Sequence, residues 1–470
     1  MSSLHPLSHA QQSLWFLYRL APDAAVYNTG VALTVRSAVD LPALERAIEA
    51  TAERHDMLRS LFAEHDGQAA RTVADRHPLG LELRELPGLT DERFRTAVRD
   101  ALREPFRLER DGAFRFVLLR RGAEDAVLLM AGHHIGTDAT SNWLILRDLL
   151  QSYRRLVDGR EPDLAPLTAD YDDYTARERD LLGSPRGARM EQYWHDFCAG
   201  AIPAEIPTDR PRPTSPGYRG STHHLDLSGP RVAGLRELAL ADGVSLFSLL
   251  LGILQGLLHR YTRQNAFLVG APTTTRLSPA TREVVGNFIN TLLFRADLAP
   301  GASFRDAARA ADAQVKAGLG RVGYPFELLT RTVNRPRTGA GSALCRITFN
   351  MIGTSSPDPL LRLLLDAADG APAEFAGLRI APFELPQAEG QLDLAVNVRQ
   401  SVDSLAVDFR YDVDLFDEAT VERFAGYFVR AVDAVLADPD AAVARLTLVD
   451  AAAMDRMFGF ATGGGGRRVG

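Results

Sequence analysis

Two histidines and a carboxylate, His133, His134 and Asp138, stand close together in one short stretch of the chain. A histidine ionises near neutral pH, so it can take a proton from an attacking nucleophile under physiological conditions. This stretch therefore favours acid–base chemistry. Because side chains of successive strand residues point to opposite faces, only one of the two histidines can face a given pocket. We expect the other to pack or hydrogen-bond as structure.

The flanking elements indicate how these side chains could be held. A continuous apolar run over residues 126–130 precedes the histidines, and apolar residues at helical spacing follow over residues 142–150. This order predicts a buried strand that ends at the histidines and a helix that begins after them. Thr137, Asp138 and Ser141 can each cap that helix, which is the simpler structural interpretation of Asp138.

Two other kinds of chemistry fit this stretch less well. Ser141 and Thr137 lie near the histidines, but no Gly-x-Ser-x-Gly nucleophile elbow accompanies them. A metal site is disfavoured because adjacent strand histidines diverge and no third ligand stands at regular spacing. The two cysteines, Cys198 and Cys345, are far apart and give neither a disulfide framework nor zinc-ligand spacing. We therefore expect no metal.

The pattern His133-His-Ile-Gly-Thr-Asp138 resembles the His-His-x-x-x-Asp-Gly signature of condensation domains of nonribosomal peptide synthetases. These domains belong to the chloramphenicol acetyltransferase-like acyltransferases. Six further stretches match that family in order, and together they cover the chain from about Pro6 to about Asp450. In chain order they are Ser8-His-Ala-Gln-Gln-Ser-Leu-Trp15, Arg54-His-Asp-Met-Leu-Arg-Ser-Leu-Phe62, Tyr171-Asp-Asp-Tyr174, Val285-Gly-Asn-Phe-Ile-Asn-Thr291, Tyr324-Pro-Phe-Glu-Leu-Leu329 and the weaker Ala343-Leu-Cys-Arg-Ile-Thr-Phe349.

The resemblance implies an α/β (α+β) fold, a pseudodimer of two chloramphenicol acetyltransferase-like lobes with a central active-site tunnel. The length of 470 residues agrees with more than one core, since a domain has about 150 residues. Strand and helix patterns alternate before and after a stretch rich in Pro, Asp and Arg. We divide the chain into an N-terminal lobe (1–175), an inter-lobe connection (176–220), a C-terminal lobe (221–450) and a flexible C-terminal linker (451–470).

The implied reaction is amide bond formation between a carrier-bound acyl or peptidyl thioester and the amine of a carrier-bound aminoacyl group. In the family motif that His133 and His134 match, the second histidine, His134, would act as general base or position the amine. Asp138 would hold the loop through a buried ion pair with Arg276, the last residue of Gly270-Ala-Pro-Thr-Thr-Thr-Arg276. Further candidates for lining the tunnel or contacting substrate are Trp15, Gly136, Ser141, Asn287, Asn290 and Asn350.

Ala139 departs from the family pattern, which has a glycine at this position. At a tightly packed loop position its methyl group would clash or narrow the passage, and overpacking costs about 1 to 3 kcal/mol. The chain is then either a working enzyme with a reshaped pocket or a catalytically silent domain that recruits partners. The retained His133, His134, Asp138 and Arg276 favour catalysis. A third interpretation is a related enzyme that transfers the acyl group to a hydroxyl and forms an ester.

The partners follow from the same resemblance. Both substrates would arrive on the 4'-phosphopantetheine arms of donor and acceptor carrier proteins, so no bound cofactor is expected. The Gly-rich end, residues 463–470, resembles the beginning of a linker to a downstream adenylation domain. The Ser-x-Ala-Gln-Gln and Arg-His-x-x-Leu-Arg segments look like those of members that join two L-configured residues. The motifs do not identify the donor acid or the acceptor.

Composition argues against several other classes. A net charge of -7 and a pI near 5.9 disfavour a nucleic-acid-binding surface. No apolar run reaches about 18 residues and no signal-peptide pattern begins the chain, so we expect neither membrane insertion nor secretion. Two distant cysteines suit a reducing cytoplasm.

Overall fold

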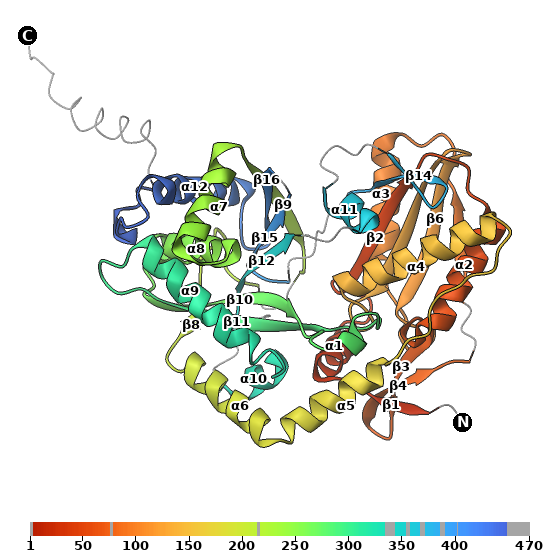
Figure 1. Cartoon of the computed structure of the whole chain (residues 1–470), viewed down its shortest axis with the longest axis horizontal. Coiled ribbons are helices and arrows are strands. Elements are labelled where there is room, and N and C mark those ends of the chain that lie inside the picture. Colours follow the sequence, from red (N-terminus) through yellow and green to blue (C-terminus); the bar gives the residue numbers. More distant parts are fainter. Residues whose placement is uncertain are drawn as a thin grey trace, which may run out of the picture.

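A computed structural model describes residues 3–75, 79–213, 217–333, 344–353, 358–366, 372–385, 391–401 and 403–448. Within these ranges the chain forms two lobes, each built around its own twisted sheet (Figure 1). The sequence prediction of a mixed α/β fold is confirmed. The predicted linker over residues 451–470 and the matched Ala343 lie outside the described ranges.

The first lobe contains a six-stranded sheet in the order β13-β14-β2-β7-β6-β5. Its strands from the first half of the chain are β2 (Asn28–Val35), β5 (Leu81–Glu85), β6 (Phe114–Gly122) and β7 (Asp125–His133). A small three-stranded sheet adds β1 (Leu4–Pro6), β3 (Ser60–His65) and β4 (Gln68–Val73). The helices are α1 (His9–Leu20), α2 (Leu41–Arg54), α3 (Asp91–Arg103) and α4 (Ala139–Val157).

The second lobe contains a seven-stranded sheet in the order β11-β10-β12-β15-β16-β9, with β8 paired to β10. The strands are β8 (Ile202–Pro203), β9 (Gly220–Ser228), β10 (Ala266–Thr274), β11 (Ile289–Asp297), β12 (Ile347–Gly353), β15 (Leu394–Gln400) and β16 (Ser404–Asp412). Its helices are α7 (Pro230–Asp242), α8 (Leu246–Thr262), α9 (Phe304–Leu319), α10 (Phe326–Thr332) and α12 (Glu418–Ala437). Of these, α7, α8, α9 and α12 lie on the side of the sheet that faces away from the first lobe (Figure 1).

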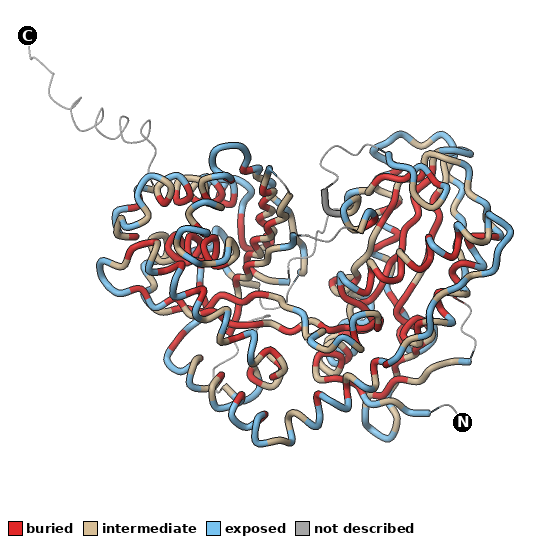
Figure 2. Tube along the Cα trace, viewed as in Figure 1, coloured by how far each residue is buried: buried red, intermediate tan, exposed pale blue. Residues whose placement is uncertain are grey.

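Two separate apolar cores account for the two lobes. Strand β16 alternates buried and half-buried residues, the pattern of a strand with one face against a core. The second-lobe helix α8 is buried on nearly every side, so it forms the centre of that core. Figure 2 shows buried residues concentrated inside each lobe, with half-buried and exposed residues where the lobes face each other. The two cores are therefore separate, and segments that cross between the lobes contribute residues to the first core.

The elements α11, β13 and β14 come from the second half of the chain but join the first lobe. Strand β14 (Leu378–Pro382) pairs antiparallel with β2, with Ile380 opposite Val35, and β13 (Ala373–Phe375) pairs with β14. Leu360 of α11 (Pro359–Asp366) belongs to the first core. The predicted C-terminal lobe over 221–450 is therefore corrected. Strands from this range pair with the free edge of β2 in the first lobe.

Two helices connect the lobes, and the first of them begins before residue 176. They are α5 (Tyr171–Leu182) and α6 (Pro185–Cys198), which run along the base of both lobes (Figure 1). Ser184 caps α6 by accepting a hydrogen bond from the Gly187 backbone N–H at 3.2 Å. No single helix in the described ranges has the length and apolarity to cross a membrane; only α7 and α8 together, bent by 103°, reach those limits.

Candidate active site

The histidines lie at the end of a central strand, as predicted. β7 ends at His133, and α4 begins at Ala139 after a short turn. The central position of β7 between β2 and β6 fixes this end of the strand from both sides. Asp138 is the N-cap of α4, and its Oδ1 accepts a hydrogen bond from the Ser141 backbone N–H at 2.7 Å.

His134 is held in one tautomer by its surroundings. Its backbone N–H donates to the Tyr27 carbonyl at 2.8 Å, which fixes the main chain. Its ring Nδ1 lies 2.9 Å from the Thr137 carbonyl oxygen, and a carbonyl can only accept. Nδ1 must therefore carry the hydrogen, and the neutral ring keeps its lone pair on Nε2. Among the described residues Nε2 has no hydrogen-bond partner.

The protonation of His134 also depends on its environment. Burial lowers the pKa of His134 below its ordinary value of 6.5, because water no longer stabilises the charged ring. The hydrogen bond to Thr137 and the charge of Asp138 both raise the pKa and partly oppose this effect. The ring is thus neutral at neutral pH, and Nε2 is ready to accept a proton.

His133 has the opposite tautomer and a different role. Its Nδ1 accepts a hydrogen bond from the Ile135 backbone N–H at 3.1 Å, so its ring hydrogen lies on Nε2. Only 3% of the residue is exposed, and Tyr18 and Phe106 approach the ring edge-on. Burial lowers the pKa of His133 to about 3. We assign His133 to the structure of the strand end.

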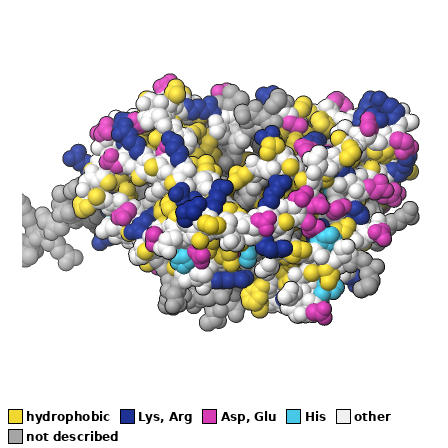
Figure 3. Space-filling view, turned by 60° about the horizontal axis from the view of Figure 1, so that its bottom comes forward, with side chains coloured by type: hydrophobic (Ala, Val, Ile, Leu, Met, Phe, Trp, Pro, Cys, Tyr) yellow, Lys and Arg dark blue, Asp and Glu magenta, His cyan; other side chains and the backbone are white. Residues whose placement is uncertain are grey.

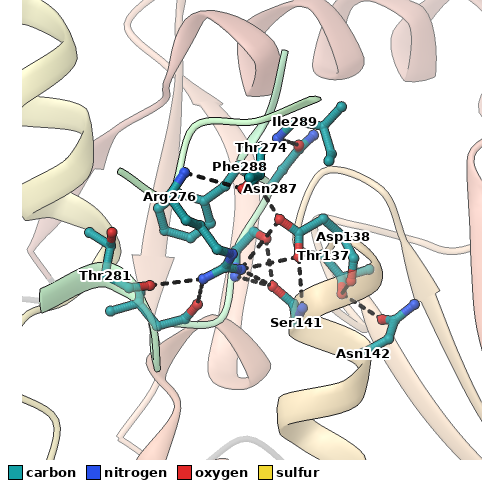
Figure 4. Close-up of polar contacts among 12 residues, drawn as sticks. Thr137, Asp138, Ser141, Asn142, Thr274, Arg276, Thr281, Asn287, Phe288 and Ile289 are labelled. Atoms are coloured by element: carbon teal, nitrogen blue, oxygen red, sulfur yellow. Dashed lines mark hydrogen bonds and ion pairs between the residues drawn. The ribbon is translucent and has the colours of Figure 1, made fainter. Parts of the chain in front are cut away.

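Asp138 is bound from both lobes (Figure 4). Nη2 of Arg276 lies 3.1 Å from Oδ1 and 3.3 Å from Oδ2 of Asp138. The Phe288 backbone N–H also donates to Oδ2 at 3.1 Å. The side chains of Asp138 and Arg276 are 1% and 5% exposed. The predicted buried ion pair is therefore confirmed, and Asp138 is engaged by partners other than His134.

Arg276 fastens the segment that crosses between the lobes after β10. Nη1 donates to the Thr281 carbonyl at 2.9 Å, and Nη2 donates to the Ser141 hydroxyl at 2.6 Å. Its guanidinium carbon lies 3.9 Å from the centre of the Phe288 ring, a cation–π contact. Arg276 thus ties this crossing segment to the first turn of α4.

Ser141 has no free hydroxyl for nucleophilic chemistry. Oγ donates to the Gly286 carbonyl at 2.7 Å and accepts from the Gly286 backbone N–H at 3.0 Å. The residue is fully buried. We therefore reassign Ser141 from the candidates for lining the passage to the support of the crossing segment.

Gly286 explains how the crossing segment passes so close to α5. A Cβ at this position would lie 2.1 Å from a ring carbon of Tyr171. The Tyr171 hydroxyl in turn donates to the Asn287 carbonyl at 2.6 Å. Gly286 therefore permits this close crossing, and Asn287 takes part through its backbone.

The other predicted site residues lie in several different parts of the fold. Asn290 holds the entry to α10, because its Nδ2 donates to the carbonyls of Val322 and Tyr324 at 2.7 and 2.8 Å. Asn350 of β12 is half-buried, and its Nδ2 lies 3.4 Å from Oδ1 of Asn397. The remaining two, Trp15 and Gly136, are buried, with Trp15 6% exposed.

Ala139 is not the tightly packed position that the sequence suggested. It is exposed, and it is the first residue of α4. Among the described residues, Ala139 is not one of those with a positive φ angle, so a side chain is tolerated there without strain. The expected clash of the methyl group is therefore wrong.

Several contributors to the site lack a sequence signal. Tyr27 and Thr137 contact His134 through their backbone carbonyls, which any residue carries. Phe288 lies within a matched family stretch, but its ring contact with Arg276 depends on the crossing geometry. A cavity of about 670 Å³ near Val284 is lined by His55, Arg71 and Tyr171 among others, and His134 is not among its lining residues.

The chain also matches a family model and known proteins. A family model described as Condensation domain matches residues 1–458. A subunit of the linear gramicidin synthase of Brevibacillus parabrevis is 34% identical over 453 residues, which make up 95% of this chain and 8% of the relative.

Among solved structures, a holo four-domain nonribosomal peptide synthetase bound to AMP and glycine superposes with a TM-score of 0.88 and 23% identity, over 96% of this chain and 34% of that one. The X-domain from teicoplanin biosynthesis, in complex with OxyB, gives a TM-score of 0.85 and 24% identity, over 96% and 97% of the two chains. These likenesses show the fold.

Proposed function

The chain belongs to the condensation domains of nonribosomal peptide synthetases, and we propose that its reaction centres on Nε2 of His134. Its fold is the chloramphenicol acetyltransferase-like pseudodimer of that family. Condensation domains are acyltransferases that form amide bonds between carrier-bound substrates, and they need no cofactor of their own. Because the chain spans less than a tenth of the gramicidin synthase relative, its own substrates and partners are proposals.

The observation that carries the mechanism is the hydrogen bond from His134 Nδ1 to the Thr137 carbonyl. It leaves Nε2 as an acceptor for the proton of the attacking amine. The amine nitrogen forms a bond to the thioester carbonyl carbon while Nε2 takes the proton. The tetrahedral intermediate then releases the thiolate of the donor arm, which recovers the proton as a thiol. General base catalysis of this kind contributes typically about 100- to 10,000-fold.

Asp138 and Arg276 support this reaction by position. Their ion pair joins α4 to the crossing segment, and α4 begins five residues after His134 in the sequence. We assign them to preorganisation of the loop rather than to proton transfer. The central tunnel through which two substrate arms would meet at His134 is part of the same proposal.

The silent recruitment module is the less favoured alternative. An exposed Ala139 removes the main reason to regard the site as damaged, and the tautomer of His134 suits a base. An ester-forming enzyme would use the same base, so the identity of the acceptor must be measured.

We propose donor and acceptor carrier proteins, with an adenylation domain after the chain, as partners in the cytoplasm. Figure 3 shows side chains of both charge signs on the face drawn, including a group of basic ones near its centre.

The proposal is tested with acyl-pantetheine thioesters as donors and aminoacyl- or hydroxyacyl-pantetheine thioesters as acceptors. We expect product with the wild-type chain and at least about a 100-fold lower rate with His134→Ala, with the fold retained by circular dichroism. His224→Ala is the matched control, because His224 is an exposed histidine on β9. Near-normal turnover by His134→Ala would remove His134 as the base.

A further inference from the structure

Thr137 is the residue whose carbonyl selects the tautomer of His134, and its side chain is held from two directions. Its hydroxyl donates to Oδ1 of Asn142 at 2.6 Å. Its methyl group packs over Gly132, where a Cβ would lie 2.9 Å from it. Thr137 is fully buried and Asn142 is 3% exposed, so water does not compete for this hydrogen bond.

Helix formation alone does not require an asparagine at position 142. It lies in the first turns of α4, and its backbone N–H already donates to the Asp138 carbonyl at 2.9 Å. Asparagine is a weak helix former, and burying its amide costs free energy unless the amide is hydrogen-bonded. The bond from Thr137 is the partner that the structure gives to its side-chain oxygen.

The Thr137 carbonyl belongs to the peptide plane between the Cα atoms of Thr137 and Asp138. The Thr137 side chain anchors the first Cα through Asn142 and Gly132, and the N-cap bond of Asp138 to Ser141 anchors the second. Releasing the Thr137 side chain therefore frees one end of the plane that carries this carbonyl. From this geometry we propose that Thr137 and Asn142 are positioning residues that keep the hydrogen of the His134 ring on Nδ1 and leave Nε2 free. The proposal deepens the proposed function and rests on His134 as the base.

The substitution Thr137→Val removes the hydroxyl and keeps a branched side chain over Gly132. We expect part of the His134 population to change to the Nε2–H tautomer and the condensation rate to fall about threefold to tenfold, the range for one lost hydrogen bond. Because the Thr137 hydrogen bond also raises the pKa of His134, the His134 ring should titrate at lower pH in this variant, as its ¹⁵N shifts would show. Thr137→Ser keeps the hydroxyl and should retain the wild-type tautomer.

A double-mutant cycle tests whether the two residues act together. Asn142→Leu should reproduce the effects of Thr137→Val, and the double variant should be no worse than either single one. Thr51→Val is the matched control, since Thr51 is also fully buried in the first lobe and its hydroxyl donates to the Ala47 carbonyl at 2.7 Å. It should lower stability to a similar degree and leave the His134 ring unchanged.

The deciding readout is the pair of ring ¹⁵N chemical shifts of His134 in the resting full chain, assigned by the loss of its signals in His134→Ala. A shift of the hydrogen to Nε2 in Thr137→Val and Asn142→Leu, but not in Thr137→Ser or Thr51→Val, supports the proposal. Unchanged ¹⁵N shifts in both Thr137→Val and Asn142→Leu would overturn it. Because no substrate is present, this result stands apart from the failure of His134 as the base, which the activity of His134→Ala reports.

Discussion

The two adjacent histidines show how strongly one residue type depends on its immediate partners. His134 donates from Nδ1 to a carbonyl, whereas His133 accepts at Nδ1 from a backbone N–H. Their neutral rings therefore carry the hydrogen on opposite nitrogens. The sequence could predict that the two side chains diverge, because strand alternation requires it. It could not predict the tautomers, since both partners are backbone atoms.

The protonation state of His134 should depend on pH in a way that its environment sets. The base must be neutral to act, and burial lowers the pKa of His134 below 6.5. As the pH falls, the ring should stay neutral to a lower pH than an exposed histidine would. We expect the ring to stay neutral until the pH drops through this lowered pKa. Titration of the His134 ring ¹⁵N shifts from about pH 4.5 to about pH 8 would measure this apart from the acceptor α-amine, which itself titrates near about 7.7 to 8.0, and a ring pKa above about 6.5 would contradict the assignment.

Ala139→Gly tests the departure from the family signature. Ala139 is exposed at the first position of α4, so restoring glycine removes no packed group. Glycine is the poorer helix former by about 1 kcal/mol in a helix interior, and less at a helix end. We expect stability to fall by under about 1 kcal/mol in chemical denaturation, with little change in rate. A gain in rate of more than tenfold would mean that the methyl group obstructs the passage.

At the scale of elements, the Arg276 guanidinium joins the crossing segment after β10 to the first lobe, beside the contacts of Ser141 with Gly286 and of Asp138 with Phe288. Arg276 bonds Asp138 and Ser141 of the first lobe and the Thr281 carbonyl of its own segment. Removing one partner leaves a buried charge without compensation, which costs about 3 to 5 kcal/mol. Arg276→Ala and Asp138→Asn should therefore lower both stability and rate, as seen by denaturation and by product formation.

The control for this pair is an exposed one. Arg231→Ala breaks the bond from Nε of Arg231 to Asp433 at 2.6 Å, where both side chains are nearly half exposed. Exposed pairs contribute about 0 to 1 kcal/mol. If Arg276→Ala costs no more than Arg231→Ala, then the buried ion pair does not hold the crossing segment.

The junction of α1, α5 and α10 gives a second test at this scale. Glu178 of α5 accepts a hydrogen bond from the His9 backbone N–H at 2.9 Å, and burial raises the pKa of Glu178 to about 7. The nearby charge of Glu327 on α10 raises it further. The Glu178 carboxyl therefore stays protonated to a higher pH in the folded chain than in the unfolded chain. The contribution of Glu178 to stability is therefore greatest at low pH and is lost as the pH rises through about 7.

Glu178→Gln should stabilise the fold above about pH 7, because glutamine keeps the acceptor for His9 and carries no charge. One unit of pKa shift corresponds to about 1.4 kcal/mol, so we expect a gain of about 1 to 3 kcal/mol above about pH 7 that disappears near about pH 4.5. Denaturation at several pH values would measure it. Glu237→Gln, an exposed glutamate on α7, serves as the control. A gain that is independent of pH would contradict the buried, protonated carboxyl.

Elements were more predictable than their assembly. Strand β7 and helix α4 follow from apolar spacing and capping residues. The family resemblance supplied the contact of Arg276 with Asp138, which no local pattern contains. The return of β13 and β14 to the first sheet was missed, because a short strand carries no information about which distant edge it completes.

At the scale of the whole molecule, two separate cores are joined by α5, α6 and the crossing segments. The two sides of the Asp138–Arg276 contact come from different lobes, so a condensing site on this chain requires both. The chain occupies 8% of the gramicidin synthase relative that it resembles, and its substrates would be delivered by other domains. The central claim is therefore best tested with those carriers present.

The most direct measurement is intact-mass detection of carrier-bound products, with a donor-loaded and an acceptor-loaded carrier protein mixed with the wild-type chain or with His134→Ala. We predict that the donor acyl group moves to the acceptor carrier with the wild-type chain alone. The mass of the acceptor carrier would then rise by the mass of that group. No transfer with matched carriers that measurably bind the chain would contradict a condensing role and favour a silent recruitment module.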